Sequence, residues 1–364
     1  MEINDQNQYP INTVVLQISL VKKHIRIKPY FHVLQNEQVV DFVKTLQEGI
    51  QLPAGNFFDV FLESISTSAL EEEILKKLSS LLNVPGAMAK QLLEKLFELG
   101  VLEYYEEEVP GTLNRYHRQL LLFDSIHPKN NFEENYTQQK KLQDAHVLIM
   151  GIGGIGNFIA TALATAGAGK ITLVDYDVVE ETNLNRQILF SENDIGKNKA
   201  EAAAKRLKEL NSNCEINCLQ KEISSIDEFE NLLQVCNGAS YIVLSADKPV
   251  DLVLWASALC KKYLFKYIKC GYMAYQGLIG PLLGYNTKPY GEIFQSWAED
   301  IRSQNDLIKS QNENHIAPSM AATNAILANI AAWELIKDIT GICESSLIEK
   351  RILFNLKTME MVYG

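Results

Sequence analysis

Residues 145–156 read Ala145-His-Val-Leu-Ile-Met-Gly151-Ile-Gly-Gly-Ile-Gly156, an apolar run that passes directly into a glycine-rich turn. The apolar run predicts a buried strand, and residues 157–166 predict a helix that Gly167 would cap. Residues 171–175 predict the next strand, so the segment is a βαβ unit with glycines at G-x-G-x-x-G spacing. Such glycines let backbone N–H groups approach phosphate oxygens without an intervening Cβ.

The residues after the second strand decide between two kinds of nucleotide. The glycine spacing alone is typical of nicotinamide or flavin dehydrogenases, and Asp175 lies where a ribose-binding acid belongs. A dinucleotide does not need the further residues Asn183, Arg186 and Lys199. A triphosphate does, because cations must offset its charge when an anion attacks the α-phosphate. The alternative is a solvated helix start in which Lys197 and Lys199 are merely exposed.

A third element adds a carboxylate. Residues 241–247 predict a buried strand that ends in Asp247, at the edge where open α/β sheets bind ligands. A carboxylate there could hold Mg²⁺ between phosphates. The alternative is that Asp247 is the N-cap of a helix after Pro249.

Composition limits the classes of protein that remain. The 364 residues are 47% apolar and 22% charged, which excludes a disordered chain or a collagen-like fibre. The sequence contains no run of 18 apolar residues and does not begin like a signal peptide. Six cysteines without a secretion signal fit a reducing compartment. The net charge of −11 argues against nucleic acid. We therefore expect a soluble cytoplasmic protein with no membrane or nucleic-acid partner.

Residues 1–110 form a separate acidic module, with 9 Lys and Arg against 16 Asp and Glu. Composition predicts strands over residues 13–21 and 24–34, a helix over 37–47 and a final strand over 101–105. Between them, Ser68 and Glu71 have capping-box spacing at a helix start, and a second helix covers residues 87–98 before Gly100. This order predicts a small winged-helix domain.

The charge of this module argues against DNA as its partner. An exposed strand edge beside a helix could instead bind an extended peptide by β-augmentation. Residues 105–114 are acidic and turn-rich and predict a linker.

Several motifs in one order resemble the ThiF/MoeB/ubiquitin-activating superfamily of adenylating enzymes over residues 115–335. They are Arg115-Tyr-His-Arg-Gln119, the glycine turn, Asp175-Tyr-Asp177, Asn183-Leu-Asn-Arg-Gln187 and Asp194-Ile-Gly-Lys-Asn-Lys199. The segments Ser245-Ala-Asp-Lys-Pro249 and Gly271-Tyr-Met resemble the MccB-like branch of peptide-modifying enzymes. Residues 20–105 are similar to the PqqD-like domains that bind leader peptides.

The resemblance implies an α/β fold with a Rossmann-like ATP-binding adenylation domain over 111–364, after a winged-helix leader-recognition domain over 1–110. The implied nucleotide-binding residues are Gly151, Gly153, Gly154, Gly156, Asp175, Asp177, Asn183, Arg186, Gln187, Lys199 and Asp247. Arg118, Arg186, Lys199 and Asp247 are the implied catalytic residues, and Asp247 is the implied Mg²⁺ ligand. Arg118 would reach the triphosphate of the partner subunit in a homodimer, whereas its alternative role is a capping salt bridge.

The sequence also departs from the superfamily pattern. Many relatives carry two Cys-x-x-Cys pairs that bind zinc, but this sequence has none, so we expect no zinc. The crossing loop over residues 284–318 contains no cysteine, which excludes a thioester on that loop. Cys270 is interpreted as a core residue. The loop is expected to be irregular and to close over a peptide, with Arg302 and His315 as candidates for holding it.

The combined prediction is an enzyme that uses ATP and Mg²⁺ to activate a carboxylate of a ribosomally made precursor peptide. The zinc-free MccB-like pattern resembles the pantocin branch, which implies dehydrative cyclisation of glutamate side chains. The alternatives are microcin C-type attachment of AMP to a peptide C-terminus, MoeB-type sulfur-carrier activation, and a non-catalytic peptide-binding scaffold. The acidity of the N-terminal module suggests a leader peptide with basic residues.

Overall fold

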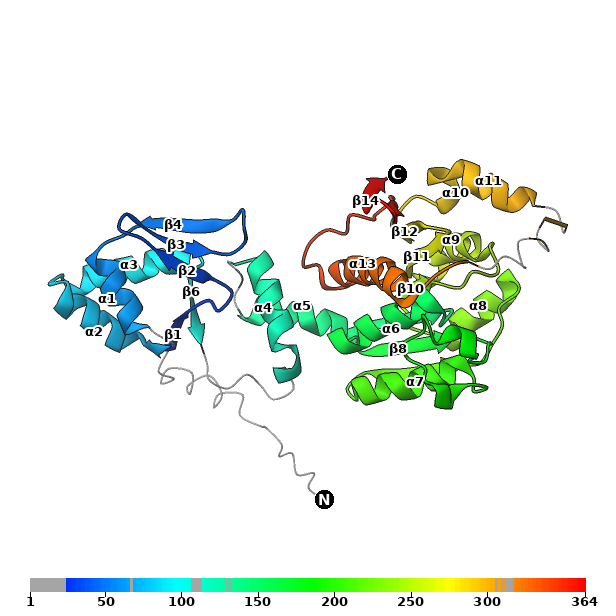
Figure 1. Cartoon of the computed structure of the whole chain (residues 1–364), viewed down its shortest axis with the longest axis horizontal. Coiled ribbons are helices and arrows are strands. Elements are labelled where there is room, and N and C mark those ends of the chain that lie inside the picture. The colour runs from blue at the N-terminus through cyan, green and yellow to red at the C-terminus, as the bar shows by residue number, and fades with distance from the viewer. Residues whose placement is uncertain are drawn as a thin grey trace, which may run out of the picture. The chain divides into compact units, whose positions relative to one another are not determined.

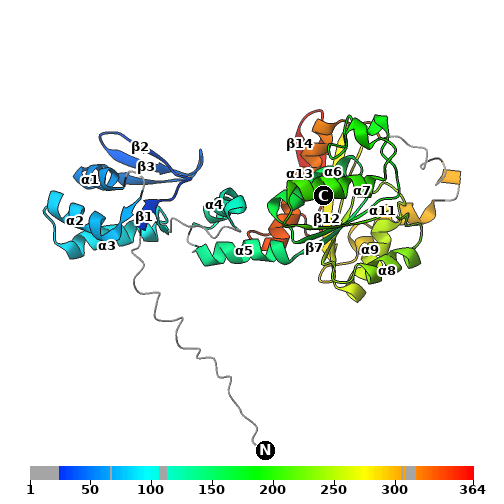
Figure 2. The same cartoon turned by 90° about the horizontal axis from the view of Figure 1, so that it is seen from below.

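The computed structural model of the chain describes residues 24–65, 68–105, 113–128, 130, 132–304, 307–308, 311 and 317–364 (Figures 1 and 2). The chain divides into two compact units, Met1–Asn131 and Phe132–Gly364. Within the described residues, none of the helices is long and apolar enough to cross a membrane. The strand predicted over residues 13–21 lies outside the described residues.

The first unit contains two small antiparallel sheets, ordered β5-β1-β6 and β2-β3-β4, together with helices. Its elements are β1 (His24–Ile27), β2 (His32–Gln35), β3 (Val39–Val43), β4 (Gly49–Pro53), α1 (Asn56–Ser64), β5 (Ala69–Leu70), α2 (Glu71–Leu81), α3 (Gly86–Glu98), β6 (Leu102–Tyr105) and α4 (His117–Ile126). Lys28 Nζ donates to both carboxylate oxygens of Asp124 at 2.8 Å, which ties the end of β1 to α4. That the unit is a winged-helix domain, and that it ends at residue 110, stay predictions.

The helix predicted over residues 37–47 is wrong. The segment contains β3, in which Val40 and Phe42 are fully buried while the residues on either side of them are partly exposed. This period of two matches the pleat of a strand, and the β-branched residues of the segment favour it. The hairpin with β4 completes the sheet.

The capping box predicted at Ser68 and Glu71 is also wrong. Helix α2 begins at Glu71, and its N-cap is Leu70, whose side chain makes no capping hydrogen bond. Residues Ala69–Leu70 pair with β1 instead, so tertiary pairing extends the backbone where a local cap was expected. The second helix and the final strand are confirmed as α3 and β6, and Gly100 follows α3 with a φ of 74°.

The second unit is built around one eight-stranded sheet. Its strands are β7 (His146–Met150), β8 (Lys170–Val174), β9 (Glu215–Leu219), β10 (Tyr241–Leu244), β11 (Lys266–Met273), β12 (Gln276–Gly284), β13 (Ile352–Asn355) and β14 (Glu360–Tyr363). Its helices are α5 (Phe132–Asp144), α6 (Gly154–Ala166), α7 (Lys199–Leu210), α8 (Ile226–Val235), α9 (Leu252–Tyr263), α10 (Tyr290–Ile293), α11 (Gln295–Ser303) and α13 (Ala321–Thr340).

The strand order is β14-β13-β12-β11-β10-β7-β8-β9, and the five strands from β11 to β9 are parallel. The chain leaves β7 in one direction, through β8 to β9, and then returns to β10 on the other side of β7. Helices α6, α7 and α13 cover one face, and α8 to α11 cover the other (Figure 2). The predicted α/β sheet with a Rossmann-like βαβ start is thereby confirmed.

The crossing segment 284–318 is more regular than expected. Helices α10 and α11 occupy residues 290–303, so the expectation of an irregular loop is wrong there. Tyr290, Phe294 and Ala298 recur every four residues and are buried against the core on the α9 face.

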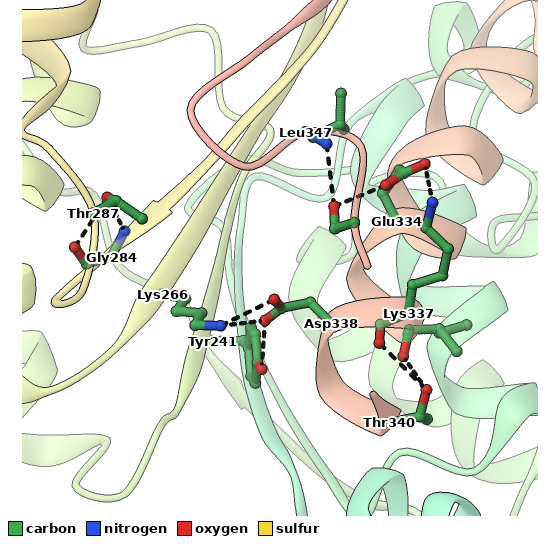
Figure 3. Close-up of polar contacts among 11 residues, drawn as sticks. Tyr241, Lys266, Gly284, Thr287, Glu334, Lys337, Asp338, Thr340 and Leu347 are labelled. Atoms are coloured by element: carbon green, nitrogen blue, oxygen red, sulfur yellow. Dashed lines mark hydrogen bonds and ion pairs between the residues drawn. The ribbon is translucent and has the colours of Figure 1, made fainter. Parts of the chain in front are cut away.

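A polar cluster ties the middle of the sheet to α13 (Figure 3). Asp338 of α13 accepts hydrogen bonds from Lys266 Nζ of β11 at 2.8 and 2.9 Å. It also accepts from Tyr241 Oη of β10 at 2.8 Å. The Asp338 carboxylate is nearly buried, so its charge depends on these donors.

We expect Asp338→Ala to lower the free energy of unfolding by about 2 kcal/mol, because the Lys266 ammonium and the Tyr241 hydroxyl lose their shared acceptor. Urea unfolding followed by circular dichroism measures the change. Lys140→Ala, which breaks the exposed Lys140–Asp144 pair, is the control and should leave the midpoint unchanged. Equal midpoints for both variants would show that the cluster contributes little.

Candidate functional site

The glycine turn lies at the point where the strand order reverses, between β7 and β10. Gly151 has a φ of 88°, and a Cβ on it would stand 2.7 Å from the backbone of Ala246, which follows β10. Ser245 Oγ donates to the carbonyls of Met150 and Gly151 at 3.0 and 2.8 Å. The two loops at the carboxyl edge are thus held in contact, at the kind of switch point where open α/β sheets bind ligands.

The N-terminus of α6 has no capping side chain and has open space beside its N-cap residue. Its N-cap is Gly153, which supplies no capping side chain, and a Cβ added to Gly153 would meet no heavy atom within 4 Å. Gly154 begins the helix, and Gly167 closes it in a left-handed conformation as predicted. The N–H groups of an uncapped first turn and the helix dipole together favour an anion such as a phosphate.

Asp175 follows β8, and its carboxylate accepts a hydrogen bond from the glycine turn. One carboxylate oxygen accepts the N–H of Ile152 at 2.6 Å, and the other accepts the N–H of Asp177 at 2.8 Å. Burial raises the pKa of Asp175, while these two backbone N–H groups act to lower it. A carboxylate that accepts two hydrogen bonds retains further acceptor sites, so Asp175 can still bind a ribose hydroxyl. That contact stays a prediction.

Lys199 begins α7, and its ammonium pairs with Asp177, two residues after Asp175. Lys199 Nζ lies 2.8 Å from Asp177 Oδ2, and its side chain is only 8% exposed. The alternative in which Lys197 and Lys199 are both merely exposed is therefore wrong for Lys199. It fits Lys197, which pairs with Asp194 at the surface.

Residues 183–187 lie between β8 and α7, and Arg186 among them lies near the start of α6. Asn183 ends a 3₁₀ turn and accepts the N–H of Glu180 through its side-chain oxygen at 3.0 Å. Arg186 Nη1 donates to the carbonyl of Thr182 at 2.6 Å, and its Cδ lies near Gly154. Gln187 is buried with its side-chain oxygen unpaired among the described residues. Arg186 is thus positioned beside the open N-terminus of α6, and phosphate contacts by all three residues stay predictions.

Sequence reasoning missed two buried asparagines that shape this site. Asn157 of α6 donates to the carbonyl of Ile152 at 2.9 Å and accepts the N–H of Leu189 at 2.7 Å. Asn324 of α13 is fully buried with no partner for its amide in the described structure. A Cβ on Gly154 would stand 2.0 Å from Asn324 Nδ2. The available signal was an asparagine among the apolar residues of each helix, although α13 carries Asn329 as well as Asn324.

Asn157→Ala should cost about 2 kcal/mol of stability and weaken ATP binding, because two buried backbone groups lose their partners and the glycine turn separates from Leu189. Calorimetric titration with ATP and urea unfolding measure the two effects. Asn329→Ala, which removes an exposed side chain of α13, is the matched control. Wild-type ATP affinity in Asn157→Ala would contradict the positioning role.

Asp247 and Arg118 are both exposed. Strand β10 ends at Leu244, three residues before Asp247, so the strand is shorter than predicted. The N-cap of α9 is Asp251, which rules out the alternative role of Asp247 as that cap. Arg118 lies on α4 of the first unit and takes part in none of the ion pairs formed among the described residues. This argues against a capping salt bridge.

The remaining candidate residues are Cys270, Arg302 and His315. Cys270 is buried in the core, its Sγ lies 3.8 Å from the carbonyl of Leu327, and burial raises its pKa to about 12. The interpretation of Cys270 as a core residue is confirmed. Arg302 lies on α11 near Gly291, whereas His315 lies outside the described residues. The part of the chain that the structure describes contains no group of three metal-ligating side chains.

Known proteins with similar sequences and structures identify the family. The ThiF family matches residues 116–363. Adenylyltransferase and sulfurtransferase MOCS3 of Drosophila yakuba is 33% identical over 177 residues, which are 49% of this chain and 36% of that protein. The chain thus spans little more than a third of this curated relative.

Two solved structures match over nearly the whole chain. E. coli MccB, solved with ATP, is 26% identical with a TM-score of 0.70, and the match covers 94% of this chain and 96% of MccB. PaaA is 20% identical with a TM-score of 0.73, covering 92% and 98%, and shows the fold alone. Because the family match extends over more than half of the residues, the chain belongs to the ThiF family.

Proposed function

We propose that this protein is an ATP-dependent adenylating enzyme that activates a carboxylate of a ribosomally made precursor peptide. The observation that carries the proposal is the open N-terminus of α6, which has Arg186 close by. The family match and the similarity to MccB, which has been solved with ATP and also with AMPCPP and MccA, support an ATP-dependent adenylating enzyme.

The chemistry follows from the charges at the site. A carboxylate oxygen attacks the α-phosphorus of ATP, and the bond from this phosphorus to the oxygen that bridges the α- and β-phosphates breaks. Pyrophosphate departs, and an acyl-adenylate is formed. The N–H groups of α6 bind phosphate oxygens, and Arg186 and Lys199 offset the charge that grows on the leaving group. Residues 284–318 contain no cysteine, so no thioester forms on that segment. A nucleophile of the peptide attacks the acyl carbon of the adenylate, the bond from that carbon to the phosphate oxygen breaks, and AMP leaves.

A magnesium ion fits the donor set. Mg²⁺ is usually held by one or two carboxylates together with substrate phosphates and water, so a full protein cage is not needed. Asp247, exposed at the carboxyl edge, would supply the carboxylate. The ion would neutralise phosphate charge and orient the triphosphate. That the protein contains no zinc stays a prediction, which metal analysis of the purified protein tests.

We propose that the first unit binds the leader peptide within residues 20–105. We also propose that the protein is a homodimer in which Arg118 contacts the triphosphate bound by the partner subunit. Strand β6 lies at the edge of its sheet, and Tyr104 there is half exposed, as β-augmentation requires. Light scattering tests the dimer: a monomer in solution would refute the role of Arg118. Leader binding that does not weaken with salt would contradict recognition of basic residues.

For the final product we propose dehydrative cyclisation of glutamate side chains, as in the pantocin branch. Microcin C-type attachment of AMP is the second candidate, favoured by the full-length similarity to MccB, which one structure names a microcin C7 biosynthetic enzyme. Incubation with Mg²⁺, ATP and candidate precursor peptides, followed by mass spectrometry, separates them. Loss of the mass of water supports cyclisation, and a retained AMP mass refutes it.

A pyrophosphate-release assay distinguishes the enzyme from a non-catalytic scaffold. We expect peptide-dependent release that falls about tenfold or more in Arg186→Ala, because the guanidinium beside α6 is lost. Calorimetry with ATP on both proteins reports whether the variant still binds nucleotide. ATP binding without any peptide-dependent release by the wild type would favour the scaffold.

A further inference from the structure

Lys269 is a charged residue at an irregular point of β11 that the proposed chemistry does not yet use. It pairs with Leu244, the last residue of β10, and so lies level with the carboxyl edge of that strand. On its other side, the register with β12 shifts between Ile268 and Cys270, so that Lys269 stands opposite a β-bulge of β12 that contains Gly280 and Pro281. Bulges are over-represented next to active sites, so this position on the sheet is a candidate for a functional residue.

The neighbours of Lys269 show which face of the sheet it occupies. Ile268 and Cys270 belong to the core under α6 and α13, whereas Leu244 belongs to the core on the α9 face. Adjacent residues of a strand point to opposite faces, so Lys269 lies on the α9 face. Helices α10 and α11 of the crossing segment pack on that same face (Figure 2).

The ammonium of Lys269 has an unusual environment. Lys266, on the same strand, is neutralised by Asp338, but Lys269 takes part in none of the ion pairs among the described residues. Burial lowers the pKa of Lys269, and the Asp247 carboxylate acts in the opposite direction. A half-buried ammonium of this kind is stabilised when an anion arrives beside it.

An approaching carboxylate needs such a cation. The triphosphate is itself an anion. Its proposed cations are Arg186, which lies between β8 and α7, and Lys199, which begins α7. A carboxylate attacking the α-phosphate is repelled by the phosphates unless a positive group stands on its own side. Lys269 lies beyond β10, on the face that carries the crossing segment.

We propose that Lys269 is a substrate-binding residue that holds the carboxylate of the peptide before attack and the acyl oxygen of the adenylate afterwards. This inference rests on the proposed function and deepens it, because it assigns the acyl half of the site to β11. The nucleotide half remains with the glycine turn. If Lys269 only supported Asp247, its substitution would change the affinity for every nucleotide by the same factor.

The test compares two ligands, AMP and 5′-O-sulfamoyladenosine acylated by the side-chain carboxyl of glutamate, a stable mimic of the acyl-adenylate. Calorimetry gives the dissociation constants for wild type, Lys269→Met, Lys269→Arg and the matched control Lys261→Met, which removes an exposed lysine of α9. We expect Lys269→Met to lose about tenfold or more of the preference for the acyl ligand, with AMP affinity changed by less than about twofold. Lys269→Arg should retain most of the preference, and Lys261→Met all of it.

Three outcomes overturn the proposal. An unchanged preference in Lys269→Met removes any contact with the acyl group. Equal losses for AMP and the acyl ligand indicate support of Asp247 or of the phosphates. A wild-type protein that binds AMP but does not prefer the acyl ligand refutes the proposed function itself, and this result is distinguishable from the other two because it appears before any substitution.

Discussion

Gly156→Ala is expected to weaken ATP binding by about 100-fold and to lower the free energy of unfolding by about 1–3 kcal/mol. A Cβ at this position would stand 2.0 Å from the carbonyl oxygen of Gly151 and 2.9 Å from Ser245 Oγ. The nearest obstacle is backbone, which cannot rotate away as a side chain can. The glycine turn must therefore move, and the N–H groups at the start of α6 move with it.

Two measurements separate the effects of Gly156→Ala. Calorimetric titration with ATP reports the site, and urea unfolding reports the fold. The matched control is Gly271→Ala in β11, where an added Cβ meets no heavy atom within 4 Å. We expect the control to bind ATP like the wild type. A Gly156→Ala protein with wild-type ATP affinity would contradict close packing of the turn as the reason for this glycine.

Lys199→Met is expected to reduce peptide-dependent pyrophosphate release by about 1000-fold while the protein remains folded. The lysine side chain is only 8% exposed, so its charge acts on the phosphates with little screening by water. Its partner Asp177 is 47% exposed and can be hydrated after the ammonium is gone, so no buried charge is left unpaired. The loss should therefore appear in catalysis rather than in stability.

The control for Lys199→Met lies two residues away. Lys197→Met removes an exposed ammonium that pairs with Asp194, and its rate should stay within about twofold of the wild type. Circular dichroism verifies the fold of both variants. If Lys197→Met lost as much activity as Lys199→Met, a general effect of net charge would replace the specific role of Lys199.

The difference between Lys199 and Lys197 illustrates how far a sequence can be interpreted. Both lysines stand in one polar segment, and the pattern alone left open whether both are exposed. The structure separates them because Lys199 begins α7 and its side chain lies along Asp177, whereas Lys197 belongs to the preceding turn. Helix phase and a partner 22 residues earlier decide burial, and neither is visible in composition.

The errors in the first unit have the same origin. The segment containing Val40 and Phe42 was predicted as a helix, although its buried residues alternate as in a strand. Ser68 and Glu71 had the spacing of a local cap, but pairing of Ala69–Leu70 with β1 prevailed. In both cases, contacts with distant strands outweighed a weak local preference.

The sequence by itself determined the βαβ start of the second unit, the uncapped glycine turn at α6 and the family to which the chain belongs. These features are local: a fully apolar run must be buried, and glycine spacing sets which backbone groups are accessible. Only the tertiary structure placed Asn324 against Gly154, Asn157 between the turn and Leu189, and Lys269 at the edge of β10. Such contacts join residues far apart in the chain, and they depend on strand order, register and helix packing, which no single stretch of sequence encodes.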